Sequence, residues 1–140
     1  MKIINGEGLL LGRVCSYAAK SLLLGEEVKI VNCEKVWVSG SRATTFHQEL
    51  IKHERRGYPP RSPKTYKVPH LFVKRTVRGM LPYKTTRGQE AYKRLKCYVG
   101  IPLEFQNQKM ETIKKANVDK LPLLKQVTVE EICNWLKGTK

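Results

Sequence analysis

The chain has 140 residues, of which 41% are hydrophobic and 8% are aromatic, a composition that is ordinary for a globular protein and excludes wholesale disorder. Its longest purely apolar runs are three leucines, at 9–11 and 22–24, far short of the roughly 20 residues that a membrane span requires. The N-terminus turns polar after two isoleucines, which is not the pattern of a secretory signal. These features predict a cytoplasmic protein without a membrane partner, and the length predicts one domain over residues 1–140.

The net charge of +15 is distributed unevenly along the chain. Residues 42–96 hold 15 of the 27 Lys and Arg residues but only three acids, so this segment carries +12 and the remaining 85 residues carry +3. Lysines spread evenly over a surface would serve solubility alone. Their concentration in one segment instead predicts a surface that binds a polyanion.

The first 40 residues show strand and helix patterns in alternation. Residues 2–5 predict a short strand, followed by a glycine-containing turn. From Leu11 onward, apolar residues recur at helical spacing and predict a helix that ends before Gly25. The β-branched stretch 28–33 predicts a second strand, and residues 36–40 predict a short extended segment.

A second helix is predicted at about 44–56, where Thr45 and Gln48 have the spacing of a capping box. Four of the seven prolines follow within residues 57–69. Proline fixes φ and biases the preceding residue away from the helical region, so this stretch is expected to form an extended loop.

The rest of the basic segment predicts two more helices. A short helix is expected around 70–80, with a break at Gly79 and Pro82. The stretch "TTRGQEAYKRLK" then restarts a helical pattern, with Ala91 and Leu95 on one face.

The last third of the chain has a different character. A strand ending in a turn is predicted at 97–102, and residues 110–112 are another candidate strand. A final helix is predicted by a capping box at Thr128 and Glu131 and by Gly138, which ends it. The order of the elements predicts a compact α/β domain with a basic insertion in its middle.

Three sequence stretches begin like catalytic or nucleotide-binding motifs, and none is complete. "NGEGLLLGR" spaces its glycines one residue too far apart for the dinucleotide fingerprint, and "GMLPYKT" has Lys84 where a P-loop requires glycine. "HERRG" ends in glycine where a zinc protease motif requires its second histidine. The sequence therefore predicts no enzyme, no cofactor, no metal and no small-molecule substrate, with a nucleotide-dependent α/β enzyme as a weaker alternative.

The cysteines give no sign of a metal site or a disulfide framework. Cys15, Cys33, Cys97 and Cys133 form no CxxC pair and no Cys/His cluster with zinc spacing. They are predicted to be reduced, buried and to act as small hydrophobic residues.

Aromatic residues are interleaved with the basic ones, at Tyr58, Tyr66, Phe72, Tyr83 and Tyr92. Such rings stack on unpaired bases in many RNA complexes, although core packing is the simpler interpretation for Phe72. The stretch "PRSP" at 60–63 matches the minimal polyproline ligand pattern. A basic adaptor that uses this arm to bind proteins is therefore the second alternative, distinguished by partners that survive nuclease treatment.

Two long stretches, "GLLLGRVCSYAAKSLLLGEEVKIVNCEKVWVSG" and "RTVRGMLPYKTTRGQEAYKRLKCYVGIP", closely resemble the universal large-subunit ribosomal protein thirteen family. The resemblance spans residues 3–138, and the form is similar to the archaeal one because the chain ends soon after "VTVEEICNWLKG". It implies a three-layer α/β/α domain with a four-stranded, mostly parallel sheet. It also implies a structural function, namely binding of large-subunit rRNA and support of subunit assembly, with rRNA and neighbouring ribosomal proteins as partners.

By motif match, the resemblance implies rRNA contacts at Arg75, Arg78, Lys84, Arg87 and Arg94. Arg13 and Lys20 also match basic positions of the family. In this interpretation the apolar centre 80–82 docks the turn on the core while the flanking cations face RNA. The region between the second helix and "RTVRG" departs from the family's N-P-x-R-G-P pattern, so only its general role is carried over. The full set of candidate rRNA-binding residues is Arg42, Arg55, Arg56, Arg61, Lys64, Lys67, Lys74, Arg75, Arg78, Lys84, Arg87 and Arg94.

Overall fold

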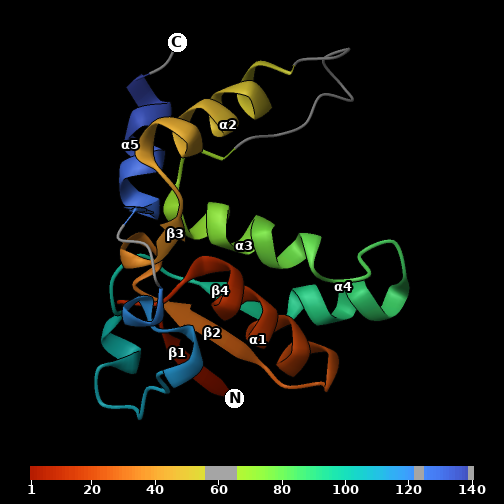
Figure 1. The fold of residues 1–140 in the computed structure, drawn as a ribbon. Coiled ribbons are helices and arrows are strands. Elements are labelled where there is room, and N and C mark those ends of the chain that lie inside the picture. Colours follow the sequence, from red (N-terminus) through yellow and green to blue (C-terminus); the bar gives the residue numbers. More distant parts are fainter. Residues whose placement is uncertain (56–65, 122–124, 139–140) are drawn as a thin grey trace.

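Three parallel strands form the main sheet, in the order β1-β2-β4 (Figure 1). They are β1 (Lys2–Asn5), β2 (Val28–Val31) and β4 (Leu95–Cys97), and Ile30 of β2 is in register with Ile4 on one side and Cys97 on the other. This computed structural model describes residues 1–55, 66–121 and 125–138.

Helix α1 (Leu11–Leu23) connects β1 to β2, as its 3.6-residue apolar spacing predicts. Its inner face is buried through Val14, Cys15, Ala18 and Leu22. The helix ends where Gly25 takes a positive φ of 93°, a left-handed conformation that glycine adopts without steric cost. The expected strand, helix and strand order of the first 31 residues is confirmed.

Helices α3 (Pro69–Gly79) and α4 (Thr86–Lys93) lie beside α1, on the same side of the sheet (Figure 1). Proline stands at the start of α3, where the missing N–H would have no helical partner anyway. The predicted helices in both stretches are therefore confirmed, with the break between Gly79 and the start of α4.

The second pair of strands is separate from the main sheet. Strand β3 (Trp37–Ser39) pairs antiparallel with β5 (Gln126–Thr128), with Val38 opposite Val127. Helices α2 (Arg42–Glu54) and α5 (Val129–Gly138) pack together next to this pair, and the rings of Phe46 and Trp135 stack with centroids 5.0 Å apart. These elements form the upper part of the molecule in Figure 1.

The strand count differs from the four-stranded sheet that the family resemblance implies. Residue 111, in the candidate strand 110–112, makes a single parallel bridge to Ile4, with N–H···O distances of 2.8 Å and 3.1 Å to β1. Met110 beside it packs on Ile3, Val31 and Phe105, whereas Lys109 and Thr112 are exposed, so the segment joins the sheet edge by this bridge alone and not by a strand. The fold class is otherwise as expected, a mixed α/β domain built on a parallel sheet.

The two faces of the main sheet are covered differently. Helices α1, α3 and α4 cover one face, whereas Phe105 of the 3-10 helix η3 (Leu103–Phe105) packs on the other, against Ile3 and Val31. Further 3-10 turns follow at η4 (Lys114–Ala116) and η5 (Val118–Lys120). The layer on this second face of the sheet therefore consists mainly of short turns and irregular chain, and not of long helices.

Two boundaries predicted from the sequence are wrong in detail, and a third prediction falls largely outside the described residues. Helix α2 begins before the proposed capping box, because Ser41 caps it: its Oγ accepts a hydrogen bond of 3.2 Å from the Thr44 N–H, while Thr45 is buried. Strand β4 occupies 95–97, earlier than the expected 97–102, because Leu95 and Cys97 are the residues in register with β2. The proline-rich loop expected at 57–69 lies largely outside the described residues.

The capping residue predicted for the last helix is correct. The Glu131 N–H donates to the Thr128 Oγ1 over 3.2 Å, which is one half of the expected capping box.

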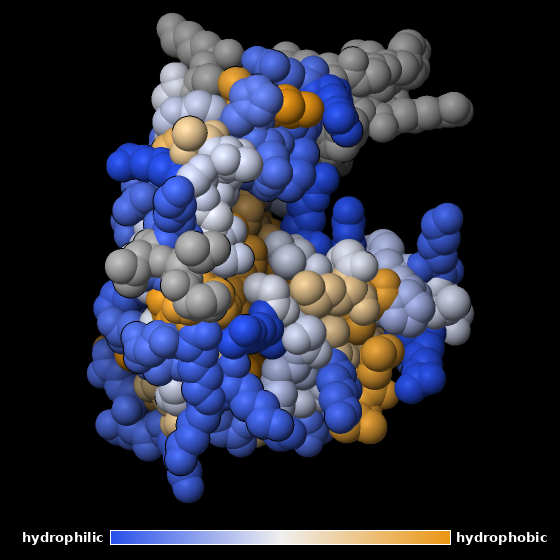
Figure 2. Space-filling model, in the orientation of Figure 1, coloured by the Kyte–Doolittle hydropathy of each residue, from blue (hydrophilic) through white to orange (hydrophobic). Residues whose placement is uncertain are grey.

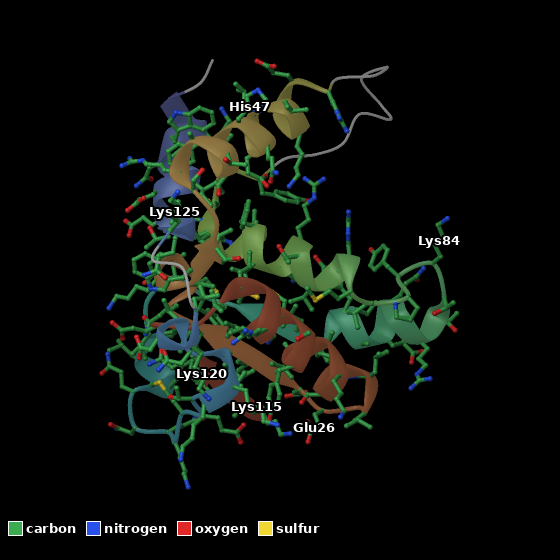
Figure 3. All side chains as sticks on the ribbon, in the orientation of Figure 1. Glu26, His47, Lys84, Lys115, Lys120 and Lys125 are labelled. Atoms are coloured by element: carbon green, nitrogen blue, oxygen red, sulfur yellow. The ribbon has the colours of Figure 1, made fainter. Side chains whose placement is uncertain are left out.

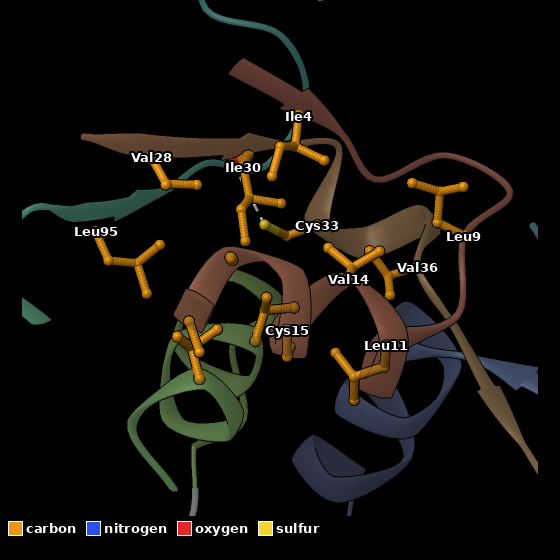
Figure 4. Packing of buried hydrophobic residues seen from close by; sticks show 14 of the residues in the cluster. Ile4, Leu9, Leu11, Val14, Cys15, Val28, Ile30, Cys33, Val36 and Leu95 are labelled. Atoms are coloured by element: carbon orange, nitrogen blue, oxygen red, sulfur yellow. Dashed lines mark hydrogen bonds between the residues drawn. The ribbon is translucent and has the colours of Figure 1, made fainter. Parts of the chain in front are cut away.

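The main core lies between the sheet and α1, where Ile4, Val14, Ile30 and Leu95 are fully buried (Figure 4). All four cysteines are free, and Cys15, Cys33 and Cys133 are buried as predicted, while Cys97 is half-buried. Burial raises the pKa of the Cys15 thiol to about 12 and that of Cys133 to about 11, so both stay protonated at neutral pH. The buried cysteines thus behave as core residues.

Candidate nucleic-acid interface

Two cations of α3 lie over aromatic rings, one ring in the turn before α4 and the other in α4 itself. The Lys74 Nζ lies 5.2 Å from the centroid of Tyr92, and the guanidinium carbon of Arg78 lies 5.3 Å from that of Tyr83. The two rings contact each other edge to face, with centroids 5.4 Å apart. Each ring holds its cation by the attraction between the charge and the π face, which limits the rotamers of the long side chains.

The position of these cations follows from the periodicity of α3. Lys74 and Arg78 are four residues apart and share one side of the helix, while Val73 and Val77 are fully buried on another. The helix therefore fixes the spacing of its cations by burying its apolar side.

The apolar centre at 80–82 docks on the core through one residue only. Leu81 is buried, whereas Met80 remains 42% exposed and Pro82 is exposed too. The expectation that all three residues anchor the turn is therefore corrected, because the chain between α3 and α4 is too tight to turn every side chain inward. Lys84 projects at the outer end of this turn (Figure 3).

Two of the candidate arginines bind the end of α1. The Arg87 Nη2 donates to the carbonyl oxygen of Leu23 over 3.4 Å, and the Arg94 Nη2 donates to that of Leu22 over 3.2 Å. The last carbonyls of a helix lack the usual partner of a following turn, so Arg87 supplies a donor to the Leu23 carbonyl oxygen. The Leu22 carbonyl oxygen also accepts from the Gly25 N–H over 3.1 Å, so Arg94 adds a second hydrogen bond there. Arg87 is exposed and keeps donors for a second partner, whereas the half-buried Arg94 is chiefly a structural residue here.

The other predicted residues lie apart from this group. The exposed Arg42 sits at the start of α2, 5.3 Å from the ring of Phe46, and Arg55 caps the far end of the same helix. Lys67 is half-buried just before α3. Arg56, Arg61 and Lys64, together with Tyr58, are outside the described residues.

The structure also brings together residues that the sequence singled out separately. Arg75 lies 5.9 Å from the ring of Tyr66, at a pocket of about 250 Å³ between α2 and α3. Figure 2 shows the surface hollowed between these two helices. The only sign of this pocket in the sequence was Glu49, an acid within a basic segment. Residue spacing alone could not show that Glu49 lies near α3.

Further cations lie outside segment 42–96. Lys115 of η4 and Lys120 of η5 lie in the lower part of the view in Figure 3, and Lys125, just before β5, lies higher, beside α5. Arg13 of α1 binds η4, because its Nη1 donates to the Lys115 carbonyl oxygen over 3.0 Å. Arg13 is therefore exposed but also makes a contact within the fold. Lys20 is exposed on the same helix.

Other kinds of site find no support in the part of the chain that the structure describes. Over these residues, no group of three or more His, Cys, Asp or Glu side chains is placed to hold a metal ion. None of the helices described is both long enough and apolar enough to cross a membrane. What the arrangement offers chemically is a row of cations held beside tyrosine rings, of which Tyr83 is exposed, and this suits phosphates and bases.

The family model described as "Ribosomal protein L13" matches residues 1–104. The chain belongs to this family. The match includes the sheet, α1, α3 and α4, so the elements that carry the cations above are family elements.

Named relatives extend the similarity over the whole chain. The large ribosomal subunit protein uL13 of Methanococcoides burtonii is 44% identical over 142 residues, covering 100% of this chain and 99% of the relative. That of Methanosarcina barkeri is 45% identical over 133 residues and covers 94% of each chain. The protein of the same name from Archaeoglobus fulgidus is 38% identical, over 96% of this chain and 86% of its own length.

These similarities confirm the resemblance seen in the sequence, including its archaeal form. The family is one of ribosomal proteins, so the chain has a structural role and is not an enzyme. The two motif fragments that suggested nucleotide binding are accordingly parts of the fold: the glycine turn before α1 and the turn between α3 and α4.

Proposed function

We propose that this chain is a constituent of the large ribosomal subunit that binds large-subunit rRNA through segment 42–96 and supports subunit assembly. The whole chain acts as one ribosomal-protein domain in the cytoplasm, on the ribosome. Its partners are the rRNA and neighbouring ribosomal proteins, without a cofactor or a small-molecule substrate.

The observation that carries this proposal is the row of cations on α3 and α4. Lys74 and Arg78 are held by rings, Arg87 by the end of α1, and Lys84 is exposed at the turn between the helices. Cations that are already ordered lose less conformational freedom when they bind phosphates, and arginine adds bidentate contacts. Such ordered cations suit the phosphates of folded RNA.

The main α/β core then serves as the support of the basic surface. RNA duplexes are recognised chiefly by their shape and backbone, because side chains do not reach the bases in the deep major groove. Affinity would come from phosphate neutralisation and release of counterions, and specificity from the fit of the rigid surface to the fold of the RNA.

The proposal is tested by sedimentation of a native lysate that contains a tagged copy of the chain. The wild-type chain is expected to migrate with the large subunit, and the triple variant Arg75→Glu, Arg78→Glu and Arg87→Glu is expected to stay near the top of the gradient. A matched control reverses three exposed lysines outside segment 42–96, Lys109→Glu, Lys114→Glu and Lys120→Glu. Thermal unfolding checks that both variants are folded.

If the triple variant and its control migrate equally with the subunit, the basic row is not the RNA-binding surface. If the wild-type chain itself fails to migrate with the subunit, the proposed function is wrong.

A further inference from the structure

The pocket between α2 and α3 is too small for a helix of RNA and large enough for a single planar group. Its volume of about 250 Å³ lies below the range of about 300–1,000 Å³ that is usual for sites of drug-sized ligands. It opens in the hollow of the surface seen in Figure 2. The residues that line it come from α2, α3, α5 and the chain before α3, and are Glu49, Lys52, Tyr66, Phe72, Arg75, Thr76, Gly79 and Leu136.

The lining combines an apolar floor with an aromatic wall and a cation. Phe72 and Leu136 belong to the core cluster between α2, α3 and α5, so they provide a fixed apolar surface. The guanidinium carbon of Arg75 lies 5.9 Å from the centroid of the Tyr66 ring. Rings and arginine planes are the surfaces on which proteins stack unpaired bases.

The pocket also contains an acid within the most basic part of the chain. Glu49 is one of only three acids in segment 42–96, and its side chain is 15% exposed, although it forms an ion pair with Lys52. A carboxylate at this place opposes the binding of phosphates. It accepts hydrogen bonds only, so a ligand that pairs with it must present N–H or O–H donors.

Lys52 does not block this acid from a ligand. Its own side chain is 57% exposed, and it pairs with the Glu49 Oε1 at i,i+3 spacing on the surface of α2. Because the Lys52 side chain is largely exposed, its ammonium can turn to a phosphate once the donors of a ligand replace it on the less exposed Glu49 carboxylate.

We propose that this pocket binds a single unpaired guanine base of the RNA, stacked against the aromatic wall with its Watson–Crick edge on Glu49. Guanine presents two neighbouring donors on that edge, N1–H and the 2-amino group, which match the two oxygens of a carboxylate. Adenine and cytosine offer an amino group beside an acceptor, and uracil offers one N–H between two acceptors, so each would place an acceptor near the carboxylate. Arg75 and Lys52, at the pocket, are then placed for the phosphates of the same nucleotide.

This inference rests on the proposed function, because it assigns one contact within the RNA that the basic surface binds. The pocket and the cation row nevertheless predict different binding properties. The cation row gives affinity without regard to sequence, whereas the pocket gives a preference for one base.

The test measures binding of the full chain to short oligouridines that differ only in one central nucleotide: guanosine, inosine, adenosine or cytidine. Inosine lacks the 2-amino group of guanosine and is otherwise the same. The wild-type chain is expected to bind the guanosine oligonucleotide about 5- to 150-fold more tightly than the inosine one, the range for a good bidentate contact. Fluorescence anisotropy at fixed salt provides the affinities.

Two variants separate recognition from simple charge. Glu49→Gln is expected to remove the preference for guanosine, because the amide has only one acceptor and turns a donor toward the base. Glu54→Gln is the matched control: it removes an equal charge from the same helix at an exposed residue that does not line the pocket, and it should leave the preference unchanged.

If the wild-type chain binds all four oligonucleotides equally while it still migrates with the large subunit, the pocket proposal is overturned and the proposed function stands. If Glu49→Gln strengthens binding to every oligonucleotide and keeps the guanosine preference, Glu49 merely opposes phosphate and the proposal is likewise overturned. If neither the oligonucleotides nor rRNA bind, both proposals are wrong.

Discussion

At the scale of single residues, Gly88 shows how closely the basic turn is packed. It lies in the first turn of α4 and is buried. A Cβ built on it would lie 2.1 Å from the carbonyl oxygen and 2.4 Å from the carbonyl carbon of Pro82. Since both atoms belong to the backbone of the turn between α3 and α4, they cannot move aside without moving the turn. Gly88 is therefore required by space and not by its φ angle.

We predict that Gly88→Ala lowers the free energy of unfolding by about 1–3 kcal/mol, the usual cost of overpacking. Urea denaturation of the purified chain measures it. The control is Gly12→Ala in α1, where a Cβ would meet nothing within 4 Å. That change should leave stability equal or raise it by about 0.4–1 kcal/mol, because alanine reduces the freedom of the unfolded chain. Equal effects of the two substitutions would contradict the close contact.

Arginine has two different uses among the candidate residues. Arg78 is placed by the ring of Tyr83, and its contact with the ring leaves the edge of its guanidinium available to a phosphate. Arg94 is directed into the protein, where its Nη2 binds the Leu22 carbonyl and its Nε is buried without a hydrogen-bond partner in the described chain. The same residue type in one motif thus lies on an aromatic ring at one position and hydrogen-bonds to the end of a helix at another.

At the scale of elements, α4 depends on a short turn that a single hydroxyl stabilises. The Thr85 Oγ1 accepts a hydrogen bond of 3.3 Å from the Gly88 N–H and donates one of 2.8 Å to the Pro82 carbonyl oxygen. The first bond caps the helix, and the second closes the turn that carries Lys84. The turn and the helix are therefore fixed by the same side chain.

We expect Thr85→Ala to cost about 1 kcal/mol of stability, as the loss of a helix cap usually does. Because α4 carries Arg87 and the turn carries Lys84, the affinity for rRNA should fall as well. Thr85→Ser retains the hydroxyl and should behave almost as the wild type. Chemical denaturation and rRNA binding of the three proteins measure both effects, and an alanine variant as stable as the serine variant would refute the role of the cap.

The elements α2 and α5 contribute a separate cluster beside α3. Phe46 stacks on Trp135, and both pack near the buried Ile132 and Leu136. Phe72 of α3 contacts this cluster as well as the main core. It therefore joins the two parts of the hydrophobic interior, and it lines the pocket that lies between α2 and α3.

At the scale of the whole molecule, charge and core are divided between different surfaces. Segment 42–96 carries +12 of the total of +15, and its helices α3 and α4 bury their apolar sides against α1 and the sheet. The chain thereby exposes its cations on helices that are packed firmly on the core. Such a surface predicts binding that is strong at low salt and weak at high salt.

If six to ten phosphates are engaged, the affinity for rRNA should fall about 10³- to 10⁵-fold between 50 and 200 mM salt. The slope of log affinity against log salt should be shallower for a variant with Arg78→Gln and Lys84→Gln, by about one unit for each phosphate contact that is lost. Filter binding over a salt series gives the slopes. An affinity that does not change with salt would contradict the whole model of the interface.

The local elements of this protein are determined by its sequence alone. Helical spacing and Gly25 define α1, the β-branched run defines β2, and Thr128 marks the start of α5, because each signal acts over a few residues along the chain. The charge of segment 42–96 also belongs to the sequence, and so does the family motif that it contains. These suffice to predict the fold class, the family and the general character of the surface.

Only the tertiary structure decides which cations face outward and what lies beside them. Arg78 and Arg94 are equivalent in a basic motif, yet one rests on Tyr83 and the other binds the end of α1, 72 residues away in sequence. Glu49 becomes part of a pocket only because α2 and α3 both pack against α5 and leave the pocket between them. The physical reason is that these contacts join residues far apart in the chain, and their pairing depends on how the buried faces of separate elements fit together.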